Sequence, residues 1–259
     1  MESTVEDPLK TELQSVQDKW HGGYFEGQPL EPLATSPYQQ VGFISILHAT
    51  YLRCIKPYVT DKTVALEIGP GRGAWTKCLL PAKEVYALDA LSAEHNGFFQ
   101  YLGHPANLKY FQVADFECDM LPDNHFDYMF SHGCLCHVSF DGVTRYARRI
   151  FQKLKSGSNC FWMIGDAEKY NSAYLHRGIW DALSRIVPAQ GQPLIAQLKQ
   201  MAGPIHRVPP DQINQAGPGQ WYAAGGARTC AMLKRAGYEI VDPDVGTNIR
   251  DPIIHFRKP

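Results

Sequence analysis

The stretch Ala65-Leu66-Glu67-Ile68-Gly69-Pro70-Gly71-Arg72-Gly73 decides the fold of this 259-residue chain. It closes an apolar run that begins at Thr63 and has the composition of a buried strand, and a helical pattern from Ala74 to Leu80 follows it. Glycine permits backbone torsions that a Cβ would forbid, so a ligand can come close to the main chain. The stretch therefore predicts a strand, a ligand-binding turn and a helix in succession.

A second acidic residue follows the next apolar run, Val85-Tyr86-Ala87-Leu88, where Asp89 stands sixteen residues after Gly73. In doubly wound folds, a glycine turn after the first strand and an acid after the second hold a nucleoside, with the acid on the ribose hydroxyls. The spacing here is Glu-x-Gly-x-Gly-x-Gly, whereas dinucleotide-binding turns have Gly-x-Gly-x-x-Gly. The pattern therefore disfavours an NAD enzyme.

This nine-residue form resembles motif I of the class I S-adenosylmethionine-dependent methyltransferases. The resemblance covers about residues 60–166 and 225–258, and it implies S-adenosylmethionine as the cofactor. It further implies that Glu67 and the glycine turn face the methionine part and that Asp89 binds the ribose. The glycines so assigned are Gly69, Gly71 and Gly73.

The resemblance implies further cofactor contacts after the next strands and near the N-terminus. Asp115 would bond the adenine amino group and Phe116 would pack on the ring, although a turn or helix cap is another role for Asp115. Ala90 would follow the ribose acid, and the small-residue region after the fourth strand would lie against the methionine part. The remaining assigned residues are Ser131, His132, Trp20 and Tyr24.

From Thr63 onward, strand-like runs alternate with helical patterns, which predicts a parallel sheet with right-handed crossovers. We expect an α/β fold, a doubly wound and mostly parallel seven-stranded sheet with a C-terminal antiparallel hairpin, plus an inserted helical cap and an N-terminal lid. An amphipathic helix is expected from Tyr38 to Ile55. The expected strands lie at about 63–68, 84–89, 108–113, 126–131, 159–165, 238–242 and 252–257, and the helices between them at about 73–80, 92–102, 139–155 and 225–236.

Four segments are expected along the chain. Residues 1–36 are polar and form an N-terminal lid over the main domain, with a partly disordered tail as the alternative. Residues 37–166 form the cofactor-binding core, and residues 221–259 complete it. Residues 167–220 interrupt the strand–helix rhythm, which is typical of a lid or binding element, so we expect a substrate cap there.

Two histidines flank the expected site after the fourth strand, His132 and His137. A hydroxyl acceptor must lose its proton as it is methylated, and a histidine of near-neutral pKa suits that task. The segment resembles antibiotic-sugar O-methyltransferases, in which the histidine at the position of His137, together with an acid after the fifth strand, is the proposed base. The resemblance therefore implies His137 as the base, supported by Asp166. A structural role for His137, capping the next helix, is the alternative.

A metal is not expected. Asp166 with Asn171 would suit Mg²⁺, but the sequence offers no clear third ligand. Cys134-Leu135-Cys136-His137 has the wrong spacing for a zinc knuckle, and no second ligand pair follows it. The seven cysteines are therefore expected to be reduced thiols.

The cap and the residues that follow it offer aromatic and basic side chains for an acceptor, with packing of the cap onto the core as an equal alternative for each of them. The residues assigned to the acceptor are His176, Arg177, Trp180, Trp221 and Tyr222. We therefore expect O-methylation of a small molecule such as a sugar or polyketide. N-methylation of an amine and a non-catalytic cofactor-binding protein are the alternatives.

Composition restricts the partners. The net charge of -1 gives no electrostatic footprint for nucleic acid or for an anionic membrane. No apolar run reaches transmembrane length, and the first seven residues are acidic, so we expect a cytoplasmic protein. The sequence leaves the oligomeric state open, with a homodimer as one option.

Overall fold

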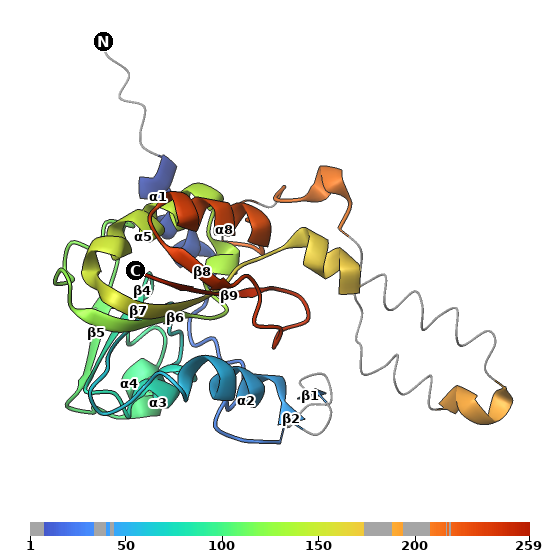
Figure 1. Cartoon of the computed structure of the whole chain (residues 1–259), viewed down its shortest axis with the longest axis horizontal. Helices are drawn as coiled ribbons and strands as arrows, with labels where there is room; N and C mark the ends of the chain where they lie inside the picture. The colour runs from blue at the N-terminus through green and yellow to red at the C-terminus, as the bar shows by residue number, and fades with distance from the viewer. Residues whose placement is uncertain are drawn as a thin grey trace, which may run out of the picture.

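A seven-stranded sheet runs through the centre of the molecule in the order β5-β4-β3-β6-β7-β9-β8 (Figure 1). The computed structural model describes residues 8–33, 40–41, 44–173, 188–193, 208–215, 217 and 219–259. Strands β3 to β7 are parallel, and β9 is antiparallel to both β7 and β8, which confirms the expected fold class. The strands are β3 (Val64–Ile68), β4 (Glu84–Asp89), β5 (Leu108–Gln112), β6 (Phe126–Ser131), β7 (Leu154–Met163), β8 (Glu239–Asp242) and β9 (Ile253–Arg257).

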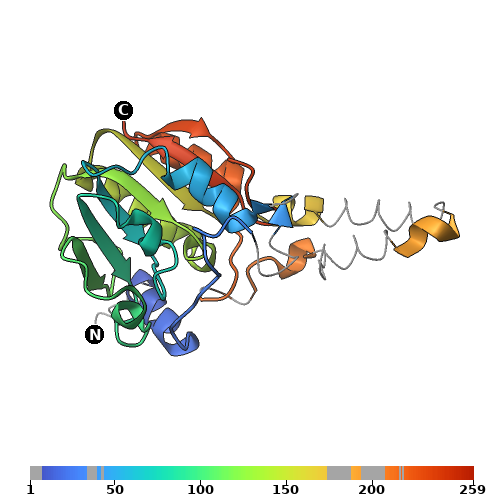
Figure 2. The same ribbon diagram turned by 90° about the horizontal axis from the view of Figure 1, so that it is seen from below.

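Helices cover both faces of this sheet (Figures 1 and 2). One face carries α1, α5 and α8, and the other carries α2, the π-helix η2, α3 and α4. Successive side chains of a strand point to opposite faces, so Leu66 and Ile68 of β3 join the first core cluster and Ala65 joins the second. The helices are α1 (Pro8–Lys19), α2 (Ile46–Thr50), η2 (Tyr51–Ile55), α3 (Thr76–Leu79), α4 (Phe98–Leu102), α5 (Phe140–Lys153) and α8 (Gly226–Arg235).

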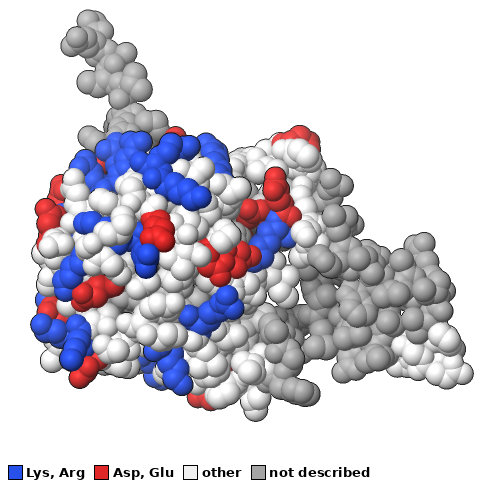
Figure 3. All heavy atoms as spheres, viewed as in Figure 1, with Lys and Arg blue, Asp and Glu red and all other residues white. Residues whose placement is uncertain are grey.

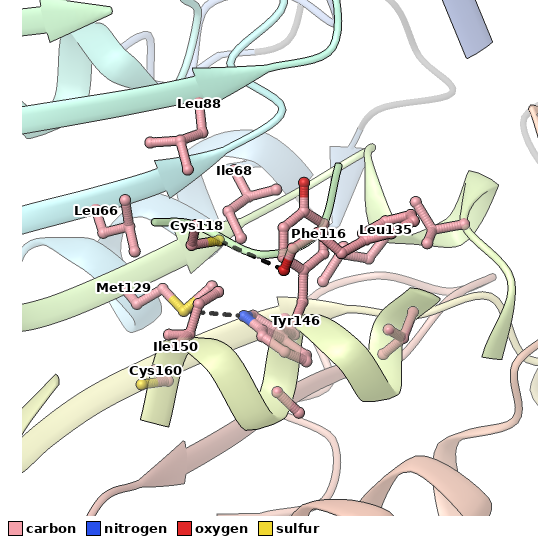
Figure 4. Close-up of a cluster of buried hydrophobic side chains, with 14 of the residues drawn as sticks. Leu66, Ile68, Leu88, Phe116, Cys118, Met129, Leu135, Tyr146, Ile150 and Cys160 are labelled. Atoms are coloured by element: carbon pink, nitrogen blue, oxygen red, sulfur yellow. Dashed lines mark hydrogen bonds between the residues drawn. The ribbon is translucent and has the colours of Figure 1, made fainter. Parts of the chain in front are cut away.

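Helix α5 packs on the strands that carry the glycine turn. Its buried residues recur at helical spacing, and in Figure 4 Tyr146 and Ile150 extend toward Leu66, Ile68 and Leu88. Ser139 caps the start of the helix, accepting a 3.0 Å hydrogen bond from the Gly142 N–H. The carboxyl ends of β3, β4 and β6 are thereby held beside the N-terminal half of α5.

The expected helix from Tyr38 to Ile55 is wrong in its first half. Strands β1 (Gln40–Val41) and β2 (Ile44–Ser45) pair antiparallel, with Val41 opposite Ile44, before α2 begins. These two residues are β-branched and favour extended backbone. The expected helix at 92–102 is also shorter, because Gly97 adopts a left-handed conformation with φ 61° directly before α4.

Strand β7 begins five residues earlier than expected, at Leu154, directly after α5 ends at Lys153. Leu154 pairs with Phe126, and the register shifts before Asn159 pairs with Tyr128. The extra residues form an irregularity in the ladder. The alternation of apolar and polar residues along a strand gives no sign of such an irregularity.

The N-terminal segment contains a helix that the sequence analysis missed. In α1, Leu13 is buried in the first core cluster, and Leu9 and Val16 pack against it. The missed signal was the spacing of Leu9, Leu13, Val16 and Trp20, which is that of one helix face. Of the expected substrate cap at 167–220, the structure describes residues 167–173, 188–193, 208–215, 217 and 219–220.

Within the described ranges, no helix combines the length and the apolar composition that a membrane crossing requires.

Candidate active site

A cavity lies beyond the carboxyl ends of β3, β4 and β6, and α1 and residues 20–24 cover it. This is the edge of an open parallel sheet at which ligands bind, next to the point where strand order reverses from β3. Seven residues that the sequence analysis singled out line this cavity. They are Trp20, Tyr24, Gly69, Gly71, Asp89, Ala90 and His137.

The glycine turn brings backbone, not side chains, to the cavity. Gly69 has φ 72°, and a Cβ there would lie 2.2 Å from the Cβ of Cys134. Gly71 has φ 52°, and a Cβ there would lie 2.9 Å from the carbonyl oxygen of Tyr24. Both positions therefore require glycine for conformation and for space.

Asp89 presents a buried carboxylate to the cavity. Its Oδ2 accepts a 3.1 Å hydrogen bond from the Gly71 N–H, and its Oδ1 accepts a 2.9 Å bond from the Leu91 N–H. Burial raises the pKa of Asp89, although these bonds and one from Asn96 oppose the rise. Asp89 lines the cavity at the position that the ribose-binding acid takes in doubly wound folds.

Two residues of the predicted turn support the cavity from behind and do not line it. Glu67 is fully buried, its Oε2 accepts a 2.6 Å hydrogen bond from Thr76 Oγ1, and burial raises its pKa to about 8. A Cβ on Gly73 would lie 2.6 Å from Leu102 Cδ1, so this glycine allows α4 to pack against the turn. The structure thus places both as supports of the turn.

The two residues assigned to adenine, Asp115 and Phe116, lie outside the cavity lining. Asp115 is exposed and accepts a 2.9 Å hydrogen bond from the Glu117 N–H, the turn role that was its alternative. Phe116 is buried in the core, edge-on to Tyr146 at 4.8 Å (Figure 4). Ser131 is buried and donates a 3.0 Å bond to the carbonyl of Ile68. None of the three lines the cavity.

Residues 20–28, here called the strap, cross the mouth of the cavity. Trp20 Nε1 donates to the Gly219 carbonyl at 2.9 Å, and the Gly23 N–H donates to Asn96 Oδ1 at 3.1 Å. The Arg72 N–H donates to the carbonyl of Tyr24 at 3.1 Å. The strap is therefore bound to the glycine turn, to the residues after β4 and to the segment before α8.

Glu26 of the strap meets His132 behind this mouth. His132 Nδ1 lies 2.9 Å from Glu26 Oε2, and Trp75 Nε1 donates to the same oxygen at 3.0 Å. Burial raises the pKa of Glu26, but His132, Trp75 and Tyr24 outweigh it, so this carboxylate has a lowered pKa. His132 packs against Trp75 at 4.6 Å and does not line the cavity. The structure thus places His132 as an anchor of the strap.

His137 does line the cavity, edge-on to Trp20 at 4.8 Å between ring centroids. Burial lowers its pKa, and a backbone hydrogen bond with Gln220 only partly opposes this. Its Nδ1 is buried, without a hydrogen-bond partner in the described part of the chain. The imidazole is therefore neutral near pH 7 and has an atom free to accept a proton.

Asp166 does not meet His137. Its Oδ2 accepts a 2.6 Å hydrogen bond from the Gly226 N–H at the start of α8, and its Oδ1 accepts a 2.8 Å bond from the Lys169 N–H. Asn171 is bonded to the backbone N–H and carbonyl of Val208. Both polar groups thus hold the chain around the cap, and the described residues contain no group of three or more metal-ligating side chains.

A different acid, Asp251, acts on His137. Asp251 is fully buried, its Oδ1 accepts a 3.0 Å bond from Trp221 Nε1, and its charge raises the pKa of His137. The Tyr222 N–H donates to the carbonyl of Cys136 at 2.7 Å, so Tyr222 holds the segment before α8 against the loop after β6. The predicted acceptor residues His176, Arg177 and Trp180 lie outside the described residues.

The sequence analysis missed a second set of residues that line the cavity. Val16 and Leu13 come from the unexpected α1, and Tyr146 comes from the buried face of α5. Gly133, with φ 69°, follows β6 as Gly69 follows β3, and that parallel was a usable signal. Further residues of this set are Gly22, Leu91, Asn96, Cys134 and Val138.

The cavity fits S-adenosylmethionine. Two glycines in left-handed conformation bring the main chain to the cavity, and a buried carboxylate stands beside them, as a nucleoside with ribose hydroxyls requires. Apolar residues of α1 and α5 supply a dry surface of the kind that a base ring needs. Gly69, Gly71 and Asp89 are the residues that would hold the cofactor.

Comparison with known proteins agrees with this geometry. A family model described as a methyltransferase domain matches residues 66–162. The fold is similar to an S-adenosylmethionine-dependent methyltransferase from Mesorhizobium loti, with 16% identity over 82% of this chain and 98% of that one and a TM-score of 0.55.

Two further structures share the fold. A putative S-adenosylmethionine-dependent methyltransferase from Listeria monocytogenes has 15% identity over 82% of this chain and 99% of that one, with a TM-score of 0.52. A possible exported protein from Bordetella parapertussis has 18% identity over 82% and 67%, with a TM-score of 0.51. No curated protein matches the sequence. Residues 66–162, which contain the glycine turn and the strands that position it, thus match a methyltransferase domain, and S-adenosylmethionine is the cofactor that this domain implies.

Proposed function

We propose that this enzyme methylates a hydroxyl group of a small molecule, of the sugar or polyketide type, with His137 as general base. S-adenosylmethionine supplies the methyl group when it is bound. The observation that supports the proposal is the position of His137, whose imidazole lines the same cavity as Gly69 and Asp89. His137 is therefore close to the place where the cofactor would bind, as the general base of a methyl transfer must be.

The electrostatics around His137 suit a transient proton acceptor. Because burial lowers its pKa, the ring is neutral at pH 7, and Nδ1 can take the proton that the acceptor hydroxyl loses. The charges of Asp251 and Glu26 favour the protonated ring, while that of Arg250 opposes it. In this proposal Asp251 takes the supporting role that the sequence analysis gave to Asp166.

The surroundings of the cavity support a small acceptor rather than a nucleic acid. The strap covers the cofactor residues, so a bulky partner would have to displace it. Acidic and basic side chains are interspersed over the face drawn in Figure 3, and the chain carries a net charge of -1. Neither feature gives the continuous basic surface that phosphate backbones require.

The test is a mass-spectrometric screen with S-adenosylmethionine and matched pairs of acceptors that differ only in a hydroxyl or an amine. We expect methylated hydroxyl products, and His137→Ala should lower their rate of formation by more than tenfold, because it removes the proton acceptor. The control is His104→Ala, since His104 is exposed and stacks on Phe99 away from the cavity.

Each other result contradicts the proposal in a different way. Products formed only from the amines would identify an N-methyltransferase. Binding of S-adenosylhomocysteine without turnover of any acceptor would identify a non-catalytic cofactor-binding protein. If the His137→Ala variant still methylates hydroxyls within a few-fold of the wild-type rate, His137 is not the base, although the reaction class stands.

A further inference from the structure

Asn96 is a buried amide in the wall of the cavity that would hold the cofactor. It lies in the loop between β4 and α4, is 2% exposed and lines the cavity. Its Oδ1 accepts a 3.1 Å hydrogen bond from the Gly23 N–H of the strap. Its side chain also hydrogen-bonds to the carboxylate of Asp89. One side chain thus contacts both the strap and the acid that is expected to bind the ribose.

Tyr110 fixes the orientation of this amide. The Tyr110 hydroxyl donates a 2.7 Å hydrogen bond to the carbonyl of Leu91, so its oxygen can only accept from Asn96. Asn96 Nδ2 accordingly donates to Tyr110 Oη at 3.0 Å, which turns Oδ1 toward the Gly23 N–H. The hydroxyl therefore decides which end of the amide faces the strap.

The strap lies close against the loop that carries Asn96. Gly22 has φ 73°, and a Cβ there would lie 2.2 Å from His95 Cδ2 and 2.5 Å from the His95 carbonyl oxygen. Before the strap, Gln17 Nε2 of α1 donates to the carbonyl of Ala90 at 2.7 Å. Gly22 and Ala90 both line the cavity. The N-terminal segment is thus bound to the residues after β4 from α1 and again from the strap.

A ligand in this cavity lies against the strap, because Trp20 and Tyr24 line it. The hydrogen bond between Gly23 and Asn96 must therefore break when the strap moves away from the ligand. We propose that Asn96 is a positioning residue, which links the strap to the carboxylate of Asp89 and thereby slows the release of S-adenosylhomocysteine. Such a link acts on the cofactor product and is independent of the acceptor.

The test measures the rate constants for binding of S-adenosylhomocysteine to the full chain by surface plasmon resonance. In Asn96→Ala the Gly23 N–H loses its partner, so the dissociation rate constant should rise about tenfold. The association rate constant should equal or exceed that of wild type, because the strap opens more easily. A general loss of stability would instead lower the melting temperature and the fraction of enzyme that binds, with no such division between the two rate constants.

Hydrogen exchange followed by mass spectrometry determines whether the strap is the element that moves. With S-adenosylhomocysteine bound at saturation, peptides from residues 20–28 should exchange faster in Asn96→Ala than in wild type, whereas peptides from β6 should not change. Faster dissociation without faster exchange in the strap would mean that Asn96 holds the ligand by direct contact. That result would overturn the proposed link.

Two further variants separate this hydrogen-bond network from general destabilisation. Tyr110→Phe removes the hydroxyl that orients the amide and should raise the dissociation rate constant about threefold. Combined with Asn96→Ala it should add nothing, because Tyr110 acts through Asn96. The matched control is Asn107→Ala, which should release the ligand at the wild-type rate. Asn107 Nδ2 also donates to backbone carbonyls, those of Leu80 and Ala82, but Asn107 does not line the cavity.

The outcomes that contradict the proposal are specific. An unchanged dissociation rate constant in Asn96→Ala, or an equal rise in Asn107→Ala, overturns it. A double variant that releases the ligand faster than Asn96→Ala alone also overturns it, because Tyr110 would then act by another route. If Asn96→Ala does not fold, Tyr110→Phe decides, and wild-type dissociation and strap exchange in that variant overturn the proposal.

Discussion

The Arg72 N–H donates a 3.1 Å hydrogen bond to the carbonyl of Tyr24, so the strap lies directly on the glycine turn. The same carbonyl oxygen excludes a Cβ from Gly71, which would lie 2.9 Å from it. The glycine therefore serves two purposes, since it forms the turn under the cofactor and gives the strap room above it. The cavity is closed by parts of the chain about fifty residues apart in sequence.

Gly71→Ala should weaken binding of S-adenosylhomocysteine by at least tenfold. The new Cβ must displace the strap, and a left-handed conformation costs a residue with a Cβ about 1–2 kcal/mol. Isothermal titration calorimetry measures the loss of affinity directly.

The control for this variant is Gly157→Ala. Gly157 also has a positive φ, 83°, but a Cβ there meets no atom within 4 Å. It should lose stability without losing cofactor affinity. Equal affinity losses in the two variants would show that general destabilisation, and not contact with the strap, explains the Gly71 result.

Asp89→Asn should weaken S-adenosylhomocysteine binding by about 10–100-fold, because hydrogen bonds to a charged group contribute about 1.5–3 kcal/mol. The amide offers one acceptor oxygen where the carboxylate offers two. The comparison is Asp115→Asn, because Asp115 is exposed and bonds within its own turn. The affinity of this variant for S-adenosylhomocysteine should stay within about threefold of the wild-type value. A larger loss for Asp115→Asn than for Asp89→Asn would support the sequence-based assignment of Asp115 to adenine.

The sheet and its glycine turn could be predicted because their signals are local. Strand composition, the turn at Gly69–Gly73 and the acid at Asp89 each lie within a few consecutive residues, and the rules for parallel sheets then place them at one edge. Position at that edge did not by itself decide which side chains face the cavity. Asp115 and Asp166 follow strands as expected, yet both bond to backbone N–H groups nearby.

The rest of the site depends on contacts between distant segments. Glu26 pairs with His132, Asp251 accepts a hydrogen bond from Trp221, and the charge of Asp251 acts on His137. These residues are far apart in sequence, so no local pattern predicts the contacts. Helix α1 is different, because its apolar face was visible in the sequence and was outweighed by the polar composition around it. In that segment the helical spacing of the apolar residues predicts the structure, whereas the polar composition does not.

Glu67 makes stability fall as the pH rises. Its pKa is about 8 in the folded protein and 4.5 ordinarily, so the folded state binds the extra proton between these values. By linkage, the free energy of unfolding then decreases from about pH 4.5 to pH 8, with a slope of roughly 1.4 kcal/mol per pH unit. Glu67→Gln should therefore melt at a higher temperature than wild type at pH 8.5, and the difference should shrink at pH 5.

Glu84→Gln provides a control of opposite sign. Lys109 lowers the pKa of Glu84 through a 2.8 Å hydrogen bond, so this variant should be equal to or slightly less stable than wild type at pH 8.5. Urea unfolding at both pH values, followed by circular dichroism, measures the differences. A pH-independent effect of Glu67→Gln would mean that Glu67 is already ionised in the folded protein.

The pH dependence of methyl transfer should identify the environment of His137. Because burial lowers its pKa, the rate at saturating S-adenosylmethionine should stay constant from pH 8 down to the ordinary histidine value of 6.5, and fall only in more acidic buffer, as Nδ1 becomes protonated. Trp20, whose ring packs edge-on at 4.8 Å, contributes to that burial. Trp20→Ala should therefore move the acid limb of the profile toward pH 6.5. An acid limb that lies above 6.5 in wild type, or that does not move in the variant, would assign it to a group other than His137.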